Sequence, residues 1–248
     1  DWHLEPISGR RAPVKHWRKI DYLDEKIAGD KKIIWELNRH QYFNILGQAY
    51  WLTNDERYAA EFNNHLDSWM DHNPPKEGIN WASSLEVGFR AISWLWAFYF
   101  FSSASAFKDQ TLWRALKFLY IHARHLETYL STYFSPNTHL TGEALALFYL
   151  GSLLPEFKEA SRWKSKGRRI LLEQLQLQVR ADGVYFEQAT CYQRYTIEIY
   201  LHFLILAERN QVALPADVAR RVERMLDVLL TLSHADRTTP SIGDADGG

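Results

Sequence analysis

The stretch LTGEALALFYLGSL, residues 140–153, is apolar on nearly every side and is followed by a charged segment at 156–179. A helix that is apolar all round is a buried helix. Ala144, Ala146 and Gly151 within it supply the small side chains that close packing of helices requires. A buried helix followed directly by a charged partner predicts a helical hairpin.

Three further pairs of the same kind are spread along the chain, and in each an apolar segment precedes a more polar, amphipathic one. The pairs are Ile33–Leu52 with Glu56–Met70, Trp81–Phe101 with Leu112–Thr132, and Thr190–Glu208 with Ala216–Ser233. The pattern predicts an all-α array of hairpins, closed into a toroid or open as a solenoid, with the apolar helices as its inner layer. We expect a short extended piece at residues 185–186 and no strand-rich region before residues 238–242.

Composition excludes several classes of protein and of site. With 29 Lys and Arg against 30 Asp and Glu, the net charge is -1, so we expect no general attraction to nucleic acid or to a membrane surface. Cys191 is the single cysteine, which excludes a disulfide or a thiolate zinc site within one chain. The longest apolar stretch, Ala91–Phe101, is far shorter than the ~20 residues of a transmembrane helix. A polyanionic ligand would therefore have to be bound by a local site.

Polar side chains gather where each of the four apolar segments begins. They are Glu36, Asn38, Arg39 and His40; Asn80, Ser83, Ser84, Glu86 and Arg90; Asn137, His139 and Glu143; and Glu187, Gln188, Tyr192, Arg194 and Tyr195. If the apolar helices run parallel in a ring, these four clusters meet at one end of its cavity. The helix N-termini at that end would add hydrogen-bond donors for an anion.

Some of these residues also have a structural interpretation. Asn137 is placed to cap the helix that follows it. Glu86 with Arg90, and His139 with Glu143, have the i, i+4 spacing of ordinary pairs on one helix face. The sequence leaves both interpretations open.

Together, the Asn, His, Tyr and Glu side chains match what β-elimination of a uronic-acid polysaccharide needs. The reaction requires a partner for the C5 carboxylate, a base for the C5 proton and an acid for the leaving oxygen. Two other classes stay open. One is an inverting glycoside hydrolase that uses two of Glu36, Glu86, Glu143 and Glu187, roughly 6.5 to 9.5 Å apart. The other is a non-catalytic helical-repeat module that binds a glycan or peptide.

Five stretches, in this order, resemble the heparinase II/III-like polysaccharide lyases, a family that includes alginate lyases. They are WELNRH at 35–40, GINWASSLE at 78–86, SPNTHLTGE at 135–143, DGVYFEQATCY at 182–192 and IGDADG at 242–247. The resemblance implies an incomplete (α/α) toroid over residues 1–237. It also implies that residues 238–248 begin a β-sandwich region whose remainder is missing from these 248 residues.

The resemblance also implies a site and a substrate. Asn137 and His139 would engage the uronate carboxylate, and Glu143 would orient His139. Tyr192 would exchange the proton, with Tyr195 as the alternate. The residues that would line the sugar subsites are Arg39, His40, Glu86, Arg90 and Glu187. The implied chemistry needs no cofactor and no metal, and the substrate would be a heparan-sulfate-like, alginate-like or exopolysaccharide polymer. A further catalytic His of the family lies in its β region, so we expect these 248 residues alone to bind without turnover. We expect a bacterial periplasmic or secreted protein.

Overall fold

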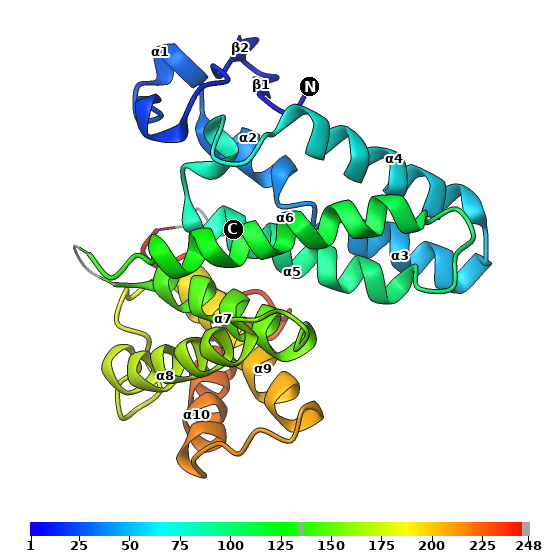
Figure 1. Ribbon diagram of the computed structural model, residues 1–248. Helices are drawn as coiled ribbons and strands as arrows, with labels where there is room; N and C mark the ends of the chain where they lie inside the picture. Colours follow the sequence, from blue (N-terminus) through cyan, green and yellow to red (C-terminus); the bar gives the residue numbers. More distant parts are fainter. Residues whose placement is uncertain (134–135, 245–248) are drawn as a thin grey trace. The chain divides into compact units, whose positions relative to one another are not determined.

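The computed structural model describes residues 1–133 and 136–244. The chain divides into two compact units, unit 1 at residues 1–129 and unit 2 at residues 130–248. Long helices dominate both units (Figure 1). The all-α class predicted from the sequence is therefore confirmed. Among the described residues, no helix combines the length and the apolar character required to cross a membrane.

Unit 1 starts with short elements and continues with two long helical hairpins. The short elements are β1 (Leu4–Glu5), β2 (Arg10–Arg11), η1 (Trp17–Lys19) and α1 (Glu25–Ala28). The longer part comprises α2 (Lys31–Asn38), α3 (Tyr42–Thr53), α4 (Glu56–His72), η2 (Ile79–Trp81), α5 (Ser84–Phe100) and α6 (Asp109–Thr128). Helices α3 and α4 form one hairpin, and α5 and α6 form the next, as predicted. The antiparallel pair β1–β2 was not predicted.

The prediction of one helix over residues 33–52 is wrong, because the chain breaks between α2 and α3. His40 lies at the break with φ 58°, in the left-handed region that a non-glycine residue rarely adopts. The indole N–H of Trp94 donates to Nδ1 of His40 at 2.8 Å, and the Phe43 ring stacks on the imidazole at a centroid distance of 4.6 Å. These tertiary contacts stabilise a conformation that the helical pattern alone does not favour.

Unit 2 contains two further hairpins. They are formed by α7 (Thr138–Leu153) with α8 (Ala160–Gln178), and α9 (Thr190–Arg209) with α10 (Asp217–Leu232). Helix α7 buries most of its residues, whereas α10 buries Val218, Val222 and Met225. Gly151 lets α7 approach α8 closely, because a Cβ there would collide with the carbonyl oxygen of Ala160. The buried and amphipathic partners, and the close packing at Gly151, are as predicted.

Two short segments of unit 2 test the remaining predictions of the fold. Val179 and Tyr185 form an isolated antiparallel bridge, which confirms the extended piece near residue 185. Residues 238–244 form no strand, and the expectation that residues 238–248 begin a β region stays a prediction. Two parts of the predicted stretches lie outside the described residues. They are residues 245–248 and Ser135.

Candidate functional site

Asn137 caps α7, which is the structural role that the sequence left open. Its Oδ1 accepts a hydrogen bond from the backbone N–H of His139 at 3.0 Å. Its Nδ2 donates to Oε1 of Glu187 at 3.3 Å. The side chain of His139 is exposed in the first turn of the same helix. An amide and an imidazole therefore lie together where α7 begins.

Glu187 connects the beginning of α7 to the segment that precedes α9. Its Oε2 accepts from both the backbone N–H and the hydroxyl of Thr138, at 3.3 and 3.1 Å. A carboxylate is favourable at this position because the first N–H groups of a helix have no partner inside the helix and carry partial positive charge. The contact brings the beginnings of α7 and α9 together at one end of unit 2. The sequence predicted that these two clusters meet, but it did not identify Thr138 as a partner of Glu187.

Tyr192 lies in the first turn of α9 and is half-buried. Its hydroxyl donates to Oδ2 of Asp244 at 3.3 Å. The thiol of Cys191 donates to the backbone oxygen of Asp244 at 2.7 Å. Tyr195 is also half-buried, three residues further along α9, and the choice between the two tyrosines stays a prediction. Asp244 belongs to the quoted stretch 242–247, but sequence reasoning assigned it no role.

Glu143 is fully buried and holds the segment that precedes α7. Its two carboxylate oxygens accept from the backbone N–H and from the hydroxyl of Ser131, at 2.7 and 2.6 Å. Burial raises the pKa of Glu143 to about 7, and the two bonds from Ser131 oppose that rise. Ser131 is thus a partner that the sequence did not indicate. A role of Glu143 in orienting His139 stays a prediction.

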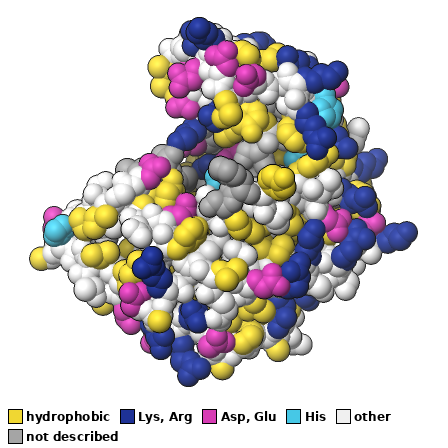
Figure 2. All heavy atoms as spheres, turned by 90° about the vertical axis from the view of Figure 1, so that its left-hand side faces the viewer, with side chains coloured by type: hydrophobic (Ala, Val, Ile, Leu, Met, Phe, Trp, Pro, Cys, Tyr) yellow, Lys and Arg dark blue, Asp and Glu magenta, His cyan; other side chains and the backbone are white. Residues whose placement is uncertain are grey.

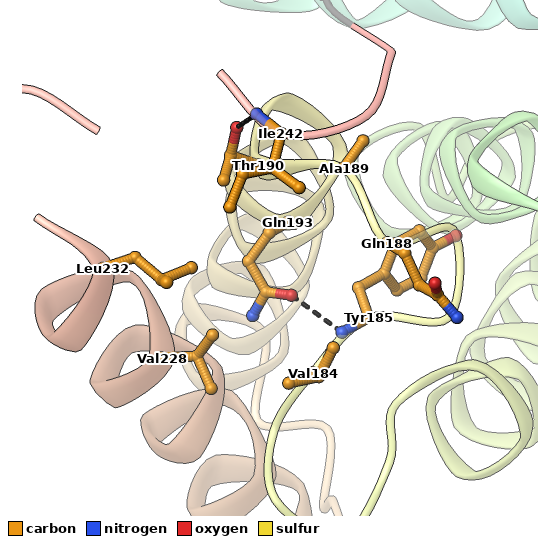
Figure 3. A pocket seen from close by; sticks show the side chains of 9 residues that line it. All are labelled: Val184, Tyr185, Gln188, Ala189, Thr190, Gln193, Val228, Leu232 and Ile242. Atoms are coloured by element: carbon orange, nitrogen blue, oxygen red, sulfur yellow. Dashed lines mark hydrogen bonds between the residues drawn. The ribbon is translucent and has the colours of Figure 1, made fainter. Parts of the chain in front are cut away.

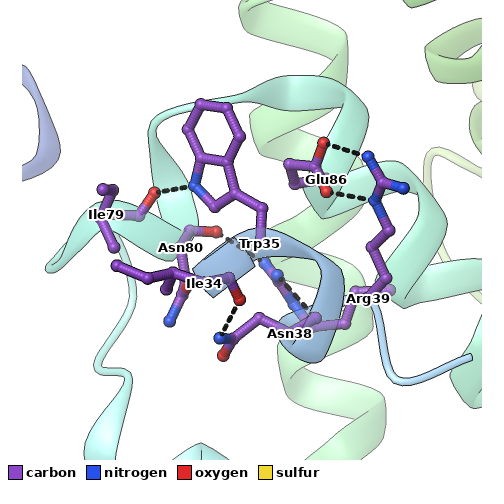
Figure 4. Close-up of polar contacts among 8 residues, drawn as sticks. Ile34, Trp35, Asn38, Arg39, Ile79, Asn80 and Glu86 are labelled. Atoms are coloured by element: carbon purple, nitrogen blue, oxygen red, sulfur yellow. Dashed lines mark hydrogen bonds and ion pairs between the residues drawn. The ribbon is translucent and has the colours of Figure 1, made fainter. Parts of the chain in front are cut away.

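In unit 1, Arg39 and Glu86 form a two-pronged ion pair where α2 ends and α5 begins (Figure 4). Nε and Nη2 of Arg39 donate to the two carboxylate oxygens of Glu86 at 2.6 and 3.0 Å. The two side chains are 10% and 4% exposed, so each charge is neutralised mainly by the other. The guanidinium carbon also lies 5.5 Å from the centre of the Phe89 ring. The sequence predicted that these clusters meet, and the structure shows that they meet as an ion pair.

Arg90 is fully buried in unit 1, so the expectation that it lines a sugar subsite is wrong. It donates to Nε2 of His122 at 3.2 Å and to the backbone oxygens of Asn38 and Asn80 at 3.3 and 3.0 Å. Its guanidinium carbon lies 4.3 Å from the centre of the Trp69 ring. Burial lowers the pKa of Arg90 to about 9, which still leaves it charged at neutral pH. Arg90 therefore connects three segments of the core.

His40 is also fully buried, which corrects the expectation that it contacts substrate. Burial and the charge of Arg90 hold the pKa of His40 and of His122 well below the usual value. Burial lowers the pKa of His125 to about 3. These three histidines are neutral at physiological pH and belong to the aromatic core of unit 1. The sequence missed the role of His122 because its partner, Arg90, is remote along the chain.

The charged side chains on the surface are mixed in sign. On the face shown in Figure 2, basic side chains in dark blue lie in several separate places, between acidic and hydrophobic ones. This agrees with the balanced net charge of the sequence. An acidic polymer would therefore be recognised by particular residues rather than by a general positive field.

Unit 2 also contains a small apolar pocket of about 210 Å³ beside the beginning of α9 (Figure 3). It is lined by Val184, Tyr185, Gln188, Ala189, Thr190, Gln193, Val228, Leu232 and Ile242. The oxygen of the Gln193 side chain accepts from the backbone N–H of Tyr185 at 2.7 Å. Burial and the charge of Glu187 raise the pKa of Tyr185, which therefore stays protonated. The pocket does not include Asn137, His139 or Tyr192.

Comparison with known proteins identifies relatives over almost the whole chain. Residues 5–247 match the family described as Heparinase II/III N-terminus. The heparin-sulfate lyase of Bacteroides stercoris is 30% identical over 240 residues, which cover 87% of this chain and 35% of that protein. The heparin-sulfate lyase of Pedobacter heparinus is 30% identical over 223 residues, which cover 87% of this chain and 33% of that protein. The chain thus spans about a third of the length of the curated relatives it matches.

Solved structures give the same result for the fold. The heparan sulfate lyase of Pedobacter heparinus matches with a TM-score of 0.70 and 26% identity, over 97% of this chain and 35% of that one. A structure of heparinase III matches with a TM-score of 0.68 and 28% identity, over 81% of this chain and 31% of that one. These matches confirm the helical toroid fold class that the sequence predicted.

Proposed function

Because this chain belongs to the heparinase II/III family, we propose that it is the helical part of a polysaccharide lyase that cleaves an acidic, uronic-acid-containing glycan by β-elimination. The observation that carries the proposal is the junction made by Glu187, which joins the beginnings of α7 and α9. Asn137 and His139 lie on the α7 side of this junction, and Tyr192 lies in the first turn of α9, the helix that follows Glu187. An amide, an imidazole and a phenol are the groups that this reaction needs.

In β-elimination, a base takes the proton from C5 of the uronate, the C4–O bond breaks, and a C4–C5 double bond forms. The leaving oxygen takes up a proton, so the overall reaction consumes no water. The C5 proton becomes acidic enough only when the carboxylate on C5 is neutralised. Asn137 and His139 lie where α7 begins, and N–H donors of their amide and imidazole side chains would supply the hydrogen bonds that neutralise the carboxylate. The hydroxyl of Tyr192 supplies the group that exchanges the proton with C5 or with the leaving oxygen.

The names of the relatives favour a heparin-like or heparan-sulfate-like polymer over alginate or a bacterial exopolysaccharide. Since the chain spans about a third of those relatives, we assign turnover to the complete gene product, in which a further region completes the site. A periplasmic or secreted location is part of the proposal, since polymers of this class lie outside the cell.

The structure gives a physical argument against the hydrolase alternative. Three of its four candidate carboxylates make internal contacts: Glu86 with Arg39, Glu143 with Ser131, and Glu187 with the beginning of α7. Glu36 is exposed on α2. An inverting hydrolase needs one acid and one base that are both available to sugar and water. The names of the relatives, all lyases, agree with this argument.

The test is the ultraviolet absorbance of the new double bond when the complete gene product is incubated with heparan sulfate, heparin and alginate. We expect absorbance to rise with a heparan-sulfate-like polymer. Tyr192→Phe should lower the rate by about 100-fold or more while the protein stays folded, because only a hydroxyl is lost. Tyr99→Phe, at a tyrosine that is 61% exposed in unit 1, is the matched control and should leave the rate unchanged.

Two results would contradict the proposal as stated. New reducing ends without any rise in absorbance would indicate a hydrolase. Loss of activity in Tyr195→Phe, together with full activity in Tyr192→Phe, would transfer the proton-exchanging role to Tyr195.

A further inference from the structure

Residues 240–244, here called the C-terminal strap, lie across the beginning of α9. The backbone N–H of Thr190 donates to the carbonyl of Ile242 at 3.0 Å, and its hydroxyl donates to the carbonyl of Pro240 at 2.8 Å. The N–H of Ile242 donates back to the Thr190 hydroxyl at 3.2 Å (Figure 3). Three hydrogen bonds on one residue of α9 therefore hold the strap in place.

A glycine allows the strap to approach this closely. Gly243 has φ 73°, a conformation that residues with a Cβ rarely adopt. A Cβ at this position would also lie 2.8 Å from the carbonyl oxygen of Gln188 and 2.9 Å from the Cβ of Ala189. The path of the strap is thus set by contacts with the segment that begins α9.

Asp244 ends the described part of the strap and contacts the two residues that follow Thr190. Its backbone oxygen accepts from the thiol of Cys191 at 2.7 Å. Its carboxylate accepts from the hydroxyl of Tyr192 at 3.3 Å. The backbone contacts fix the place of the carboxylate, and the carboxylate in turn gives the phenol a fixed acceptor.

We propose that Asp244 is a positioning residue for elimination, which holds the hydroxyl of Tyr192 in the place where it exchanges a proton with the sugar. This inference rests on the proposed function and on Tyr192 as the tyrosine that performs the exchange. A half-buried tyrosine can rotate about two side-chain bonds and about its C–O bond, and a fixed acceptor removes much of that freedom. Proton exchange needs the oxygen within hydrogen-bond reach of its target, so a small displacement is costly to the rate.

The first test compares two variants of Asp244 in the complete gene product by steady-state kinetics. Asp244→Ala removes the acceptor and should lower kcat about 10- to 100-fold, with KM changed by less than about twofold, because substrate binding stays intact. Asp244→Asn keeps an oxygen that accepts the same bond and should restore most of kcat. Asp227→Ala, at an exposed aspartate on α10, is the matched control and should leave both constants unchanged.

The second test acts on the strap without touching the pair. Thr190→Val keeps the shape of the side chain but removes the hydroxyl that bonds Pro240 and Ile242. The strap keeps only the backbone bond from Thr190 to Ile242, so it should be held less firmly, and kcat should fall as in Asp244→Ala. Thr190→Ser keeps the hydroxyl and should match the wild type. The midpoint of thermal unfolding, measured for each variant, separates lost positioning from lost folding.

The outcomes separate this inference from the proposed function. If the wild type yields no double bond from any uronic-acid polymer, the proposed function fails, and the role in elimination fails with it. If the wild type is active and Asp244→Ala has a normal kcat, the inference alone is wrong. The inference is also wrong if Asp244→Asn is no better than Asp244→Ala, or if KM rather than kcat carries the loss.

A measurement that needs no turnover tests the contact itself. In protein labelled with 3-fluorotyrosine, the fluorine resonance that disappears in Tyr192→Phe is that of Tyr192. Asp244→Ala should shift this resonance, and Asp227→Ala should not. An unchanged resonance in Asp244→Ala would overturn the contact on which the inference depends.

Discussion

Replacing Glu143 by Gln should change how the stability of the protein depends on pH. Burial raises the pKa of Glu143 from 4.5 to about 7 in the folded state. Between these two pH values the folded protein keeps a proton that the unfolded chain has released, so rising pH favours unfolding. At roughly 1.4 kcal/mol for each pH unit, the stability lost between about pH 4.5 and about pH 7 amounts to ~3 kcal/mol.

The assay is urea unfolding, followed by far-ultraviolet circular dichroism, at about pH 4.5 and about pH 8. Glutamine has no charge to bury and still offers one acceptor and one donor to Ser131. From the lower to the higher pH, the free energy of unfolding of the wild type should therefore fall by up to ~3 kcal/mol through this group. Glu143→Gln should not show this fall. Glu173→Gln, at an exposed carboxylate on α8, serves as the control and should follow the wild type. The reasoning is refuted if the curves of Glu143→Gln and of the wild type run parallel between the two pH values.

Three further predictions concern single contacts. Asn137→Ser keeps an oxygen that caps α7 but removes the amide, so activity should fall while the free energy of unfolding changes by less than about 0.5 kcal/mol. Asn137→Ala also removes the cap, so it should lower the free energy of unfolding, measured in urea, by ~1 kcal/mol. Arg39→Met leaves the carboxylate of Glu86 buried without its partner and should lower the free energy of unfolding by ~3 kcal/mol. The double variant, with Met at both positions, should recover a large part of that loss. Gly47→Ala places a methyl group 2.5 Å from the ring of Phe100 between α3 and α5 and should lower the midpoint of thermal unfolding by several degrees, since overpacking costs ~1–3 kcal/mol.

The hairpins could be predicted from the sequence because their signal is local. Helix α7 is apolar on nearly every side, and α8 carries a polar face, so periodicity alone identifies a buried helix and its partner. The Asn137 cap was likewise visible as an Asn directly before an apolar run. These two features depend on a few consecutive residues, and both were predicted correctly.

The break at His40 could not be predicted in this way. Residues 33–52 contain no proline, and the one glycine, Gly47, lies inside α3. The left-handed conformation of His40 is stabilised by Trp94, which lies 54 residues further along the chain. Nothing in the local pattern reports a hydrogen bond of that kind.

The candidate site shows the same difference between local features, which the sequence predicts, and long-range contacts, which it does not. Sequence reasoning placed polar residues at the beginnings of the buried helices, and the structure brings the Arg39 and Glu86 clusters together, and likewise the Asn137 and Glu187 clusters. It could not tell an accessible polar residue from a buried one, because the partners that hold Arg90 in the core, Asn38, Asn80 and His122, lie in other segments of the chain. That the pairs in the two units serve one substrate stays a prediction.

The buried guanidinium of Arg90 has a consequence for how unit 1 opens. Its three acceptors, on Asn38, Asn80 and His122, belong to segments that are distant in the sequence, and all three must be in place before the cation loses its water. A partly opened unit that exposed one segment would leave a charge in the core with donors unsatisfied. We therefore expect three segments to open together as a single cooperative unit: α2, the first turns of α5, and the part of α6 around His122. Their amide protons should exchange with solvent at one common rate.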